Sequence, residues 1–230
     1  MNDSLHTQYG YAAPGLAADR QRVLRNTYWL LALSLVPTVL GAWIGVSTGF
    51  MATMGFGMST LVFFIGAFGL MFVIEKTKNS SMGVVALLGF TFFMGLMLSR
   101  LVAQVLGYRN GASLVMTAFG GTAAIFFAMA SLATVIKRDL SGMGKFLFVG
   151  AIILMVAGIA NIFLQSSALM LTVLVLMLGV FSAFMLYDIK RVLDGGETNY
   201  ISATLAIYLD IYNVFQSLLS LLGIFGGERD

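Results

Sequence analysis

The sequence predicts an all-α, polytopic membrane protein with seven transmembrane helices. The 230-residue chain is 59% hydrophobic and only 10% charged, against about 25% charged residues in an ordinary soluble domain. Four long segments contain no charged residue, and a fifth contains only Asp210; the five are 26–74, 79–99, 110–136, 146–187 and 198–227. A spanning helix needs about 20 mostly apolar residues. The first and fourth segments are therefore long enough for two helices each, which gives seven.

Polar, turn-forming residues divide the two longest segments. Ser47, Thr48 and Gly49 interrupt the first, and the second is interrupted by a group that comprises Asn161, Gln165, Ser166 and Ser167. Clusters of this kind mark loops. The expected spans are 27–47, 52–75, 82–106, 111–136, 146–165, 168–188 and 201–225. Because Arg100 and Gln104 lie in the second half of the third span, that half is expected either to cross the bilayer or to lie at its interface.

Lys and Arg residues predict the orientation of the chain. With the N-terminus inside, the inner segments hold ten of them: Arg20, Arg22, Arg25, Lys76, Lys78, Lys137, Arg138, Lys145, Lys190 and Arg191. The outer segments hold only Arg100, Arg109 and Arg229. Since cytoplasmic loops are enriched in Lys and Arg, the N-terminus is expected in the cytoplasm and the C-terminus in the periplasm. Residues 1–25 are polar and are expected to form a flexible cytoplasmic tail before a transmembrane domain over 26–230.

Several kinds of chemistry are disfavoured by composition. The chain has no cysteine, and its single histidine, His6, lies in the tail. Thiol-ligated metals and histidine-dependent hydrolysis within the membrane are therefore excluded, and no cofactor or metal is expected. The formal net charge of +3 is small and lies at the membrane edges, which indicates contact with phospholipids and not with nucleic acid.

Two aspartates are the candidate functional residues. Asp188 ends the sixth span, and Asp210 lies inside the seventh, where Asn213 and Ser217 recur on the same helical face. A carboxylate within the membrane is costly and indicates function; the alternative is that Asp210 only hydrogen-bonds to its neighbours and fixes helix packing. If the two acids meet, they can share a proton. We therefore expect a proton-sensitive latch that closes a cation path lined by Asn213 and Ser217.

Several segments carry a resemblance to a known family. They are Leu24-Arg25-Asn26-Thr27-Tyr28, Gly120-Gly121-Thr122-Ala123 with Phe126-Phe127, Ala160-Asn161-Ile162-Phe163-Leu164-Gln165, Gly195-Gly196-Glu197-Thr198-Asn199-Tyr200-Ile201, and Tyr212-Asn213 through Ser217-Leu218-Leu219-Ser220. From about residue 20 onward the sequence resembles the Bax-inhibitor-1 superfamily and, within it, the bacterial YccA-like branch. The resemblance implies six helices around a central seventh, in the bacterial inner (cytoplasmic) membrane.

The resemblance implies two functions. YccA-like proteins modulate FtsH, an ATP-dependent membrane protease, as slowly degraded substrates, and the polar tail would be the segment that such a protease grips. Other bacterial members are pH-sensitive calcium leak channels, with Ca²⁺ and H⁺ as partners. Asp188 and Asp210 fall on the Tyr-Asp and Tyr-Leu-Asp motifs of the aspartate pair that gates them. A basic partner on the second helix is expected too, and Lys76 or Lys78 is the candidate.

Paired aspartates on late helices also occur in presenilin-type intramembrane proteases. Tyr187-Asp188 fits that pattern, but Asp210 follows Tyr-Leu and not Gly-x-Gly, and the sequence has no Pro-Ala-Leu. We therefore expect a protein that is not an enzyme.

Overall fold

The computed structural model describes residues 14–228, and every regular element in that part of the chain is an α-helix. The helices are α1 (Pro14–Thr48), α2 (Phe50–Thr53), α3 (Phe56–Thr77), α4 (Ser81–Leu106), α5 (Gly111–Val135), α6 (Ser141–Leu164), α7 (Ser167–Leu193) and α8 (Tyr200–Gly226). Seven of them are long and apolar enough to cross a membrane, and α2 is a four-residue turn. The predicted fold class is confirmed.

Most helix boundaries lie close to the predicted ones. α1 ends at Thr48 and α6 at Leu164, so both predicted breaks are present. α4 is one continuous helix that contains Arg100 and Gln104, which makes the whole third span helical. The largest difference is at the start of α1. The helix begins at Pro14, so the predicted flexible tail is helical from there to residue 25, and the remainder of that tail lies outside the described residues.

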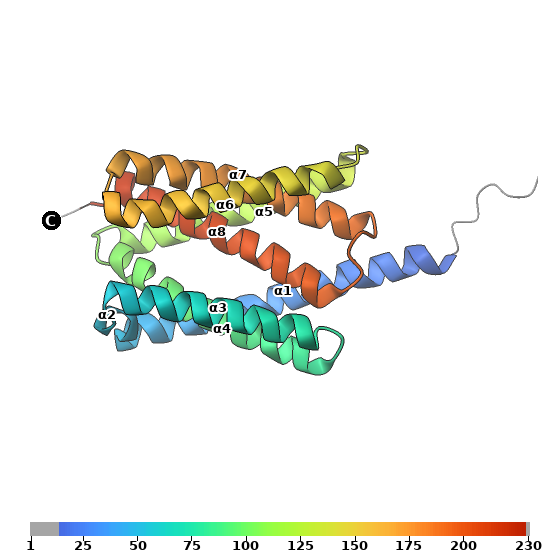
Figure 1. Ribbon diagram of the computed structural model, residues 1–230, viewed down its shortest axis with the longest axis horizontal. Helices are drawn as coiled ribbons and strands as arrows, with labels where there is room; N and C mark the ends of the chain where they lie inside the picture. The colour runs from blue at the N-terminus through green and yellow to red at the C-terminus, as the bar shows by residue number, and fades with distance from the viewer. Residues whose placement is uncertain (1–13, 229–230) are drawn as a thin grey trace, which may run out of the picture.

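The bundle has two layers with α8 between them (Figure 1). One layer contains α1, α3 and α4, and the other contains α5, α6 and α7. α8 packs against α1, α3, α4, α5 and α7, while α6 packs mainly against α7. The last helix is therefore central, as expected, but α6 is joined to it chiefly through α7. Every basic residue that was assigned to the inner segments from residue 20 to residue 191 lies at the end of the bundle where α1 begins, here called the α1 end.

Hydroxyl groups attach α8 to the first layer. Thr204 donates to the carbonyl oxygen of Thr27 on α1 (3.3 Å). The Tyr208 hydroxyl shares a hydrogen bond with the Thr38 hydroxyl (2.9 Å), and Tyr212 donates to the carbonyl oxygen of Met94 on α4 (3.4 Å). Since residues four apart lie on one face of a helix, these three side chains hold one side of α8 to α1 and α4. The other side of α8 is left for α5 and α7.

Glycines allow α1 and α4 to approach closely. A Cβ atom added at Gly41 would collide with the carbonyl oxygen of Phe92, and one added at Gly95 would collide with that of Thr38. At Gly45 the collision would be with the side chain of Ser99. Small residues spaced in this way let helices pack through their backbones in a bilayer, where van der Waals contact drives association. The α1–α4 pair is therefore the most closely packed pair in its layer.

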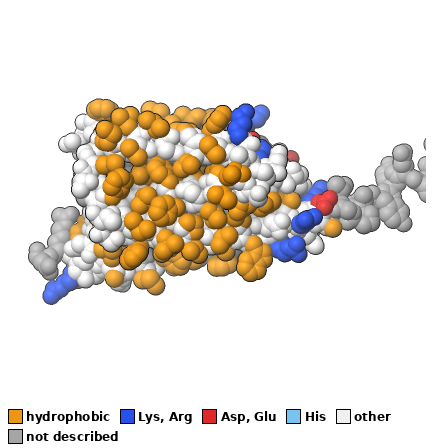
Figure 2. Space-filling model, turned by 90° about the horizontal axis from the view of Figure 1, so that it is seen from below, with side chains coloured by type: hydrophobic (Ala, Val, Ile, Leu, Met, Phe, Trp, Pro, Cys, Tyr) orange, Lys and Arg blue, Asp and Glu red, His pale blue; other side chains and the backbone are white. Residues whose placement is uncertain are grey.

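The outer surface fits a lipid environment. Figure 2 shows hydrophobic side chains covering the long side of the bundle, with Lys and Arg side chains at its ends, most of them at the α1 end. Many large apolar side chains point outward, among them Trp29, Trp43, Ile65, Phe146 and Phe163. Such a surface would be unfavourable in water and is the one expected against acyl chains.

A short polar connection at the α1 end leads into α6. The Asp139 carboxylate accepts hydrogen bonds from the backbone N–H (2.8 Å) and the hydroxyl (2.9 Å) of Ser141, the first residue of that helix. These bonds hold the pKa of the Asp139 carboxyl below its usual range, because they stabilise its charged form. Asp139 therefore satisfies donors at the start of α6 that have no partner within the helix.

Candidate functional site

The structure brings the two predicted aspartates together. Asp188 lies on α7, five residues before its end at Leu193, and Asp210 is the eleventh residue of α8. The two helices are antiparallel neighbours, and the two carboxyl groups lie close enough to interact directly. Asp210 is almost completely buried, with 4% of its surface exposed, whereas Asp188 is partly buried. A carboxyl–carboxyl hydrogen bond requires a proton on one partner, so the pair can hold one proton between two oxygen atoms.

Asn213 and Ser217, which were predicted to line a cation path, differ in their hydrogen bonds. The Asn213 amide donates to the carbonyl oxygen of Leu209, one turn earlier on its own helix (2.8 Å). Ser217 is fully buried, and its hydroxyl has no hydrogen-bond partner among the described residues; the same is true of Oδ2 of Asp210. Asp210 and Ser217 are two helical turns apart, or about 10 Å at 1.5 Å per residue. Buried polar atoms without a partner are rare, so these two mark where a water molecule or an ion would be stabilised.

A cavity of about 270 Å³ reaches Asp188 from the α1 end. Its outer lining includes Glu75 of α3 and Arg191 of α7, whose side chains are 62% and 45% exposed. Leu209, which precedes Asp210, lines its inner part. The remaining lining residues are Val192, Glu197, Ser202, Ala203, Leu205 and Ala206. Asp188 is thus the member of the pair that faces the cavity.

The lysines proposed as a basic partner have other neighbours. Lys78 forms an ion pair with Glu75 on the same helix, and Lys76 lies over the ring of Phe72, 5.5 Å from its centroid. The cation that lines the cavity with Asp188 is Arg191, one helical turn further along α7. Among the residues that line the cavity, the basic residue beside Asp188 is therefore on α7, and a partner role for Lys76 or Lys78 stays a prediction.

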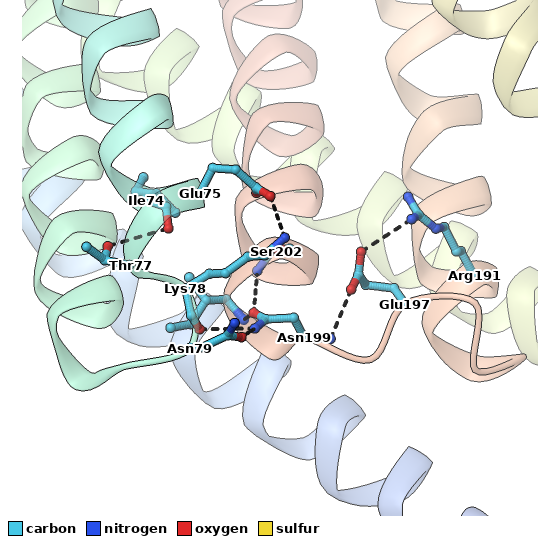
Figure 3. Close-up of polar contacts among 10 residues, drawn as sticks. Ile74, Glu75, Thr77, Lys78, Asn79, Arg191, Glu197, Asn199 and Ser202 are labelled. Atoms are coloured by element: carbon cyan, nitrogen blue, oxygen red, sulfur yellow. Dashed lines mark hydrogen bonds and ion pairs between the residues drawn. The ribbon is translucent and has the colours of Figure 1, made fainter.

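The loop between α7 and α8 reaches the turn between α3 and α4 (Figure 3), and its residue Glu197 lines the cavity. Glu197 forms an ion pair with Arg191 (3.4 Å) and accepts a hydrogen bond from the backbone N–H of Asn199 (2.9 Å). The Asn199 amide nitrogen donates to the carbonyl oxygen of Lys78 (3.0 Å) and to Oδ1 of Asn79 (2.9 Å) in the turn between α3 and α4. Segments more than a hundred residues apart in the sequence are joined here.

The sequence did not identify three residues near this cavity as part of the site. Glu75, Glu197 and Asn199 lie in or next to short polar connections. Only folding brings Glu75 and Glu197 around one cavity and Asn199 to the α3–α4 turn. One signal was present in the sequence. Asn199 directly before an apolar segment is typical of a helix N-cap, and it does cap α8 by accepting from the N–H groups of Ile201 (2.9 Å) and Ser202 (3.1 Å).

Comparison with known proteins gives matches over almost the whole chain. The model of the family described as "Inhibitor of apoptosis-promoting Bax1" matches residues 20–227. The chain is 38% identical to the Modulator of FtsH protease YccA of Escherichia coli K12, with 88% of this chain and 90% of that protein covered. It is 40% identical to an uncharacterized membrane protein of Vibrio cholerae (90% and 91% covered). A Neisseria meningitidis protein is 37% identical, with 97% and 99% covered. These similarities extend over all seven spanning helices.

Proposed function

The chain belongs to the Bax inhibitor-1 family, and from this premise we propose that it modulates an ATP-dependent membrane protease of the FtsH type. In this proposal the chain is a slowly degraded, substrate-like partner and not an enzyme. The observation that carries the proposal is the near-full-length similarity to a relative named as a modulator of FtsH protease. A second relative is named as an inner membrane protein, and we place the chain, a multi-pass membrane protein, in the same membrane.

The shape of the α1 end supports this role. α1 extends beyond the other helices at this end, so its first turns lie away from the rest of the bundle (Figure 1). All ten basic residues of the predicted inner segments lie at this end, and by the positive-inside rule we assign it to the cytoplasm. A protease that grips an exposed terminus on that side would meet the N-terminal segment first.

The experiment is a measurement of protein half-life in cells with active and with depleted FtsH. Deleting residues 2–13 removes the segment before α1 and keeps Arg20, Arg22 and Arg25, which hold the orientation. We expect the deletion to lengthen the half-life only where FtsH is active. Replacing the same segment with a Gly/Ser stretch of equal length is the matched control, and it should restore degradation. An unchanged half-life after the deletion would contradict the proposal that the protease engages the protein at its N-terminal segment.

A second candidate function is favoured by one observation, the close approach of the carboxyl groups of Asp188 and Asp210 on neighbouring helices. We propose that this pair closes a calcium leak and that pH sets its strength. At low pH the shared proton is retained and α7 stays bound to α8. At high pH both groups ionise and repel each other at short range. The two functions are compatible, because a leak protein can also be a substrate of the protease.

The test of the second function is calcium flux into dye-loaded liposomes that contain the purified protein. The flux is expected to rise as pH increases, and protein-free liposomes supply the background. A protein that passes no calcium at any pH would exclude the leak.

A further inference from the structure

The cavity that reaches Asp188 has a defined mouth. Its exposed lining residues, Glu75 and Arg191, lie at the α1 end, while Asp188 and Leu209 lie further in. The α7–α8 loop, residues 194–199, supplies Glu197 to the lining of this cavity, and we call it the mouth loop. Glu197 lines the cavity together with Arg191 and Asp188, so the contacts that fix this loop also fix one wall of the route to Asp188.

Three neighbouring elements hold the mouth loop in place. From α7, Arg191 forms its ion pair with Glu197 and also donates from Nε to the carbonyl oxygen of Gly196 (3.3 Å). From the α3–α4 turn, Lys78 and Asn79 accept the two hydrogen bonds of Asn199. From α1, the Arg20 side chain packs directly on Gly195, where a Cβ would lie 2.6 Å from its Nε.

The backbone of the mouth loop depends on a glycine. Gly195 has φ +79°, in the left-handed region that glycine adopts without strain. This turn ends α7, directs the chain toward the α3–α4 turn and leaves no side chain in the place that Arg20 occupies. The loop is therefore built to lie between the two layers of the bundle.

Asn199 has two separable roles. Its Oδ1 caps α8, and its Nδ2 attaches the loop to the α3–α4 turn. An aspartate at this position would keep the capping oxygen and lose both donated hydrogen bonds. Asp is as good an N-cap residue as Asn, so Asn199→Asp removes the attachment without removing the cap.

We propose that the mouth loop is a gate that controls access from the α1 end to the aspartate pair. The Arg191–Glu197 ion pair and the Asn199 attachment favour the closed position, and breaking either opens the cavity to water and cations. This inference rests on the proposed leak function for its purpose, but the gate itself can be tested without measuring flux.

Access to the cavity can be measured by chemical modification of an introduced cysteine. The sequence contains no cysteine, so a single introduced one is the only thiol. Ala206→Cys places the thiol inside the cavity. Its rate of modification by a membrane-impermeant, cationic methanethiosulfonate reagent is measured in vesicles of each orientation. We expect slow modification in the parent, and only from the face where α1 begins. Adding Asn199→Asp should raise the rate about tenfold, the effect expected from losing two hydrogen bonds that favour closure. Glu197→Gln should raise it in the same direction.

Three controls separate gating from general loosening. Gly142→Cys is an exposed site with open space around it, and its rate should not change with the state of the loop. Ser217→Cys reports on the buried core and should stay slow in every variant. Asp194→Asn removes the ion pair that Lys190 makes with the C-cap residue of α7, the first residue of the mouth loop. This pair attaches the loop to neither α1 nor the α3–α4 turn, and Asp194 does not line the cavity, so the substitution should leave the Ala206→Cys rate unchanged.

The outcomes are distinct. Equal rates at Ala206→Cys with and without Asn199→Asp would overturn the gate, as would an Asp194→Asn variant that is modified as fast as Asn199→Asp. Modification from the opposite face would show that the cavity is reached another way and would also overturn it. If Asn199→Asp speeds modification but no variant passes calcium, the gate stands and the leak function fails.

Discussion

At the scale of single residues, the main feature is the contact between the carboxyl groups of Asp188 and Asp210. Asp210 is surrounded by the bundle, and its partner Asp188 lies between it and a cavity that opens at the α1 end. Other polar groups on α8 face the opposite way, where Tyr208 and Tyr212 bond to the first layer. The pair therefore links α8 to the second layer at one point, and the state of its proton affects that contact directly.

Replacing either aspartate should remove the pH response. Asp188→Asn and Asp210→Asn each leave one carboxyl group beside an amide, so two negative charges can no longer oppose each other at high pH. Each variant should still fold, because the amide can keep a hydrogen bond to the remaining carboxyl group. The pH dependence of calcium flux in liposomes should be shifted or abolished in both.

The matched control for these variants is Asp194→Asn, which removes an exposed carboxylate six residues from Asp188 and should respond like the parent. If Asp188→Asn and Asp210→Asn both show the same pH dependence of calcium flux as the parent, the latch hypothesis is wrong. Asp210 is then a residue that only stabilises helix packing.

Asp139 gives a second pH-dependent prediction, for stability. Because its pKa is lowered in the folded protein, its stabilising effect is present above the unfolded-state value, about 3.9, and is lost as pH falls through the folded-state value. Asp139→Ala should therefore lower the melting temperature slightly at pH 7. The difference from the parent should vanish in acid below the ordinary aspartate range, as followed by tryptophan fluorescence in detergent. A difference that persists there would show that the carboxylate is not the stabilising group.

At the scale of helices, the α1–α4 pair depends on backbone contact. Gly95→Ala places a methyl group against the carbonyl oxygen of Thr38, and overpacking of this kind typically costs about 1–3 kcal/mol. The free energy of unfolding in mixed detergent should fall by that amount. Gly89→Ala on the same helix is the matched control, since nothing lies within 4 Å of its added Cβ. Equal stability of the two variants would contradict the packing argument.

The helices were predictable to different degrees. The breaks near Gly49 and Gln165 follow from local chemistry, because polar, turn-forming residues interrupt long apolar runs. The early start of α1 at Pro14 was missed, although proline is favoured at the first position of a helix. α7 continues past Asp188 because Lys190 and Arg191 can extend their charged ends to water from a helix end. Hydropathy identifies the spanning parts of helices better than their extensions.

The site was predictable only in part, and the reason is geometric. An aspartate in an apolar segment is visible from sequence alone, whereas its pairing with a second one was expected from the family resemblance. Glu75, Glu197 and Asn199 carry no such signal, because charged and polar residues are ordinary at the end of a membrane helix. Antiparallel packing between distant segments brings Glu75 and Glu197 around one cavity and brings Asn199 to the α3–α4 turn.

At the scale of the whole molecule, orientation is the first prediction to check. The ten-to-three distribution of basic residues and the odd number of spans predict a cytoplasmic N-terminus and a periplasmic C-terminus. An alkaline phosphatase fusion after Asp230 should be active, and a fluorescent protein fused before Met1 should fluoresce in the cytoplasm. A phosphatase fusion that is inactive, with a fluorescent C-terminal fusion, would mean that the last helix does not cross the membrane.

The close packing of α1 on α4 has a mechanical consequence. A pull on the start of the chain acts along the axis of α1, so its contacts with α4 are loaded in shear and must fail together instead of peeling apart one by one. The first helix to be extracted would then also be among the hardest to extract, and the rate of forced unfolding, not the equilibrium stability, would set the pace. For a motor that pulls on the N-terminus, resistance comes at the beginning of the task, and a chain that stalls the motor there occupies it for as long as the pair holds.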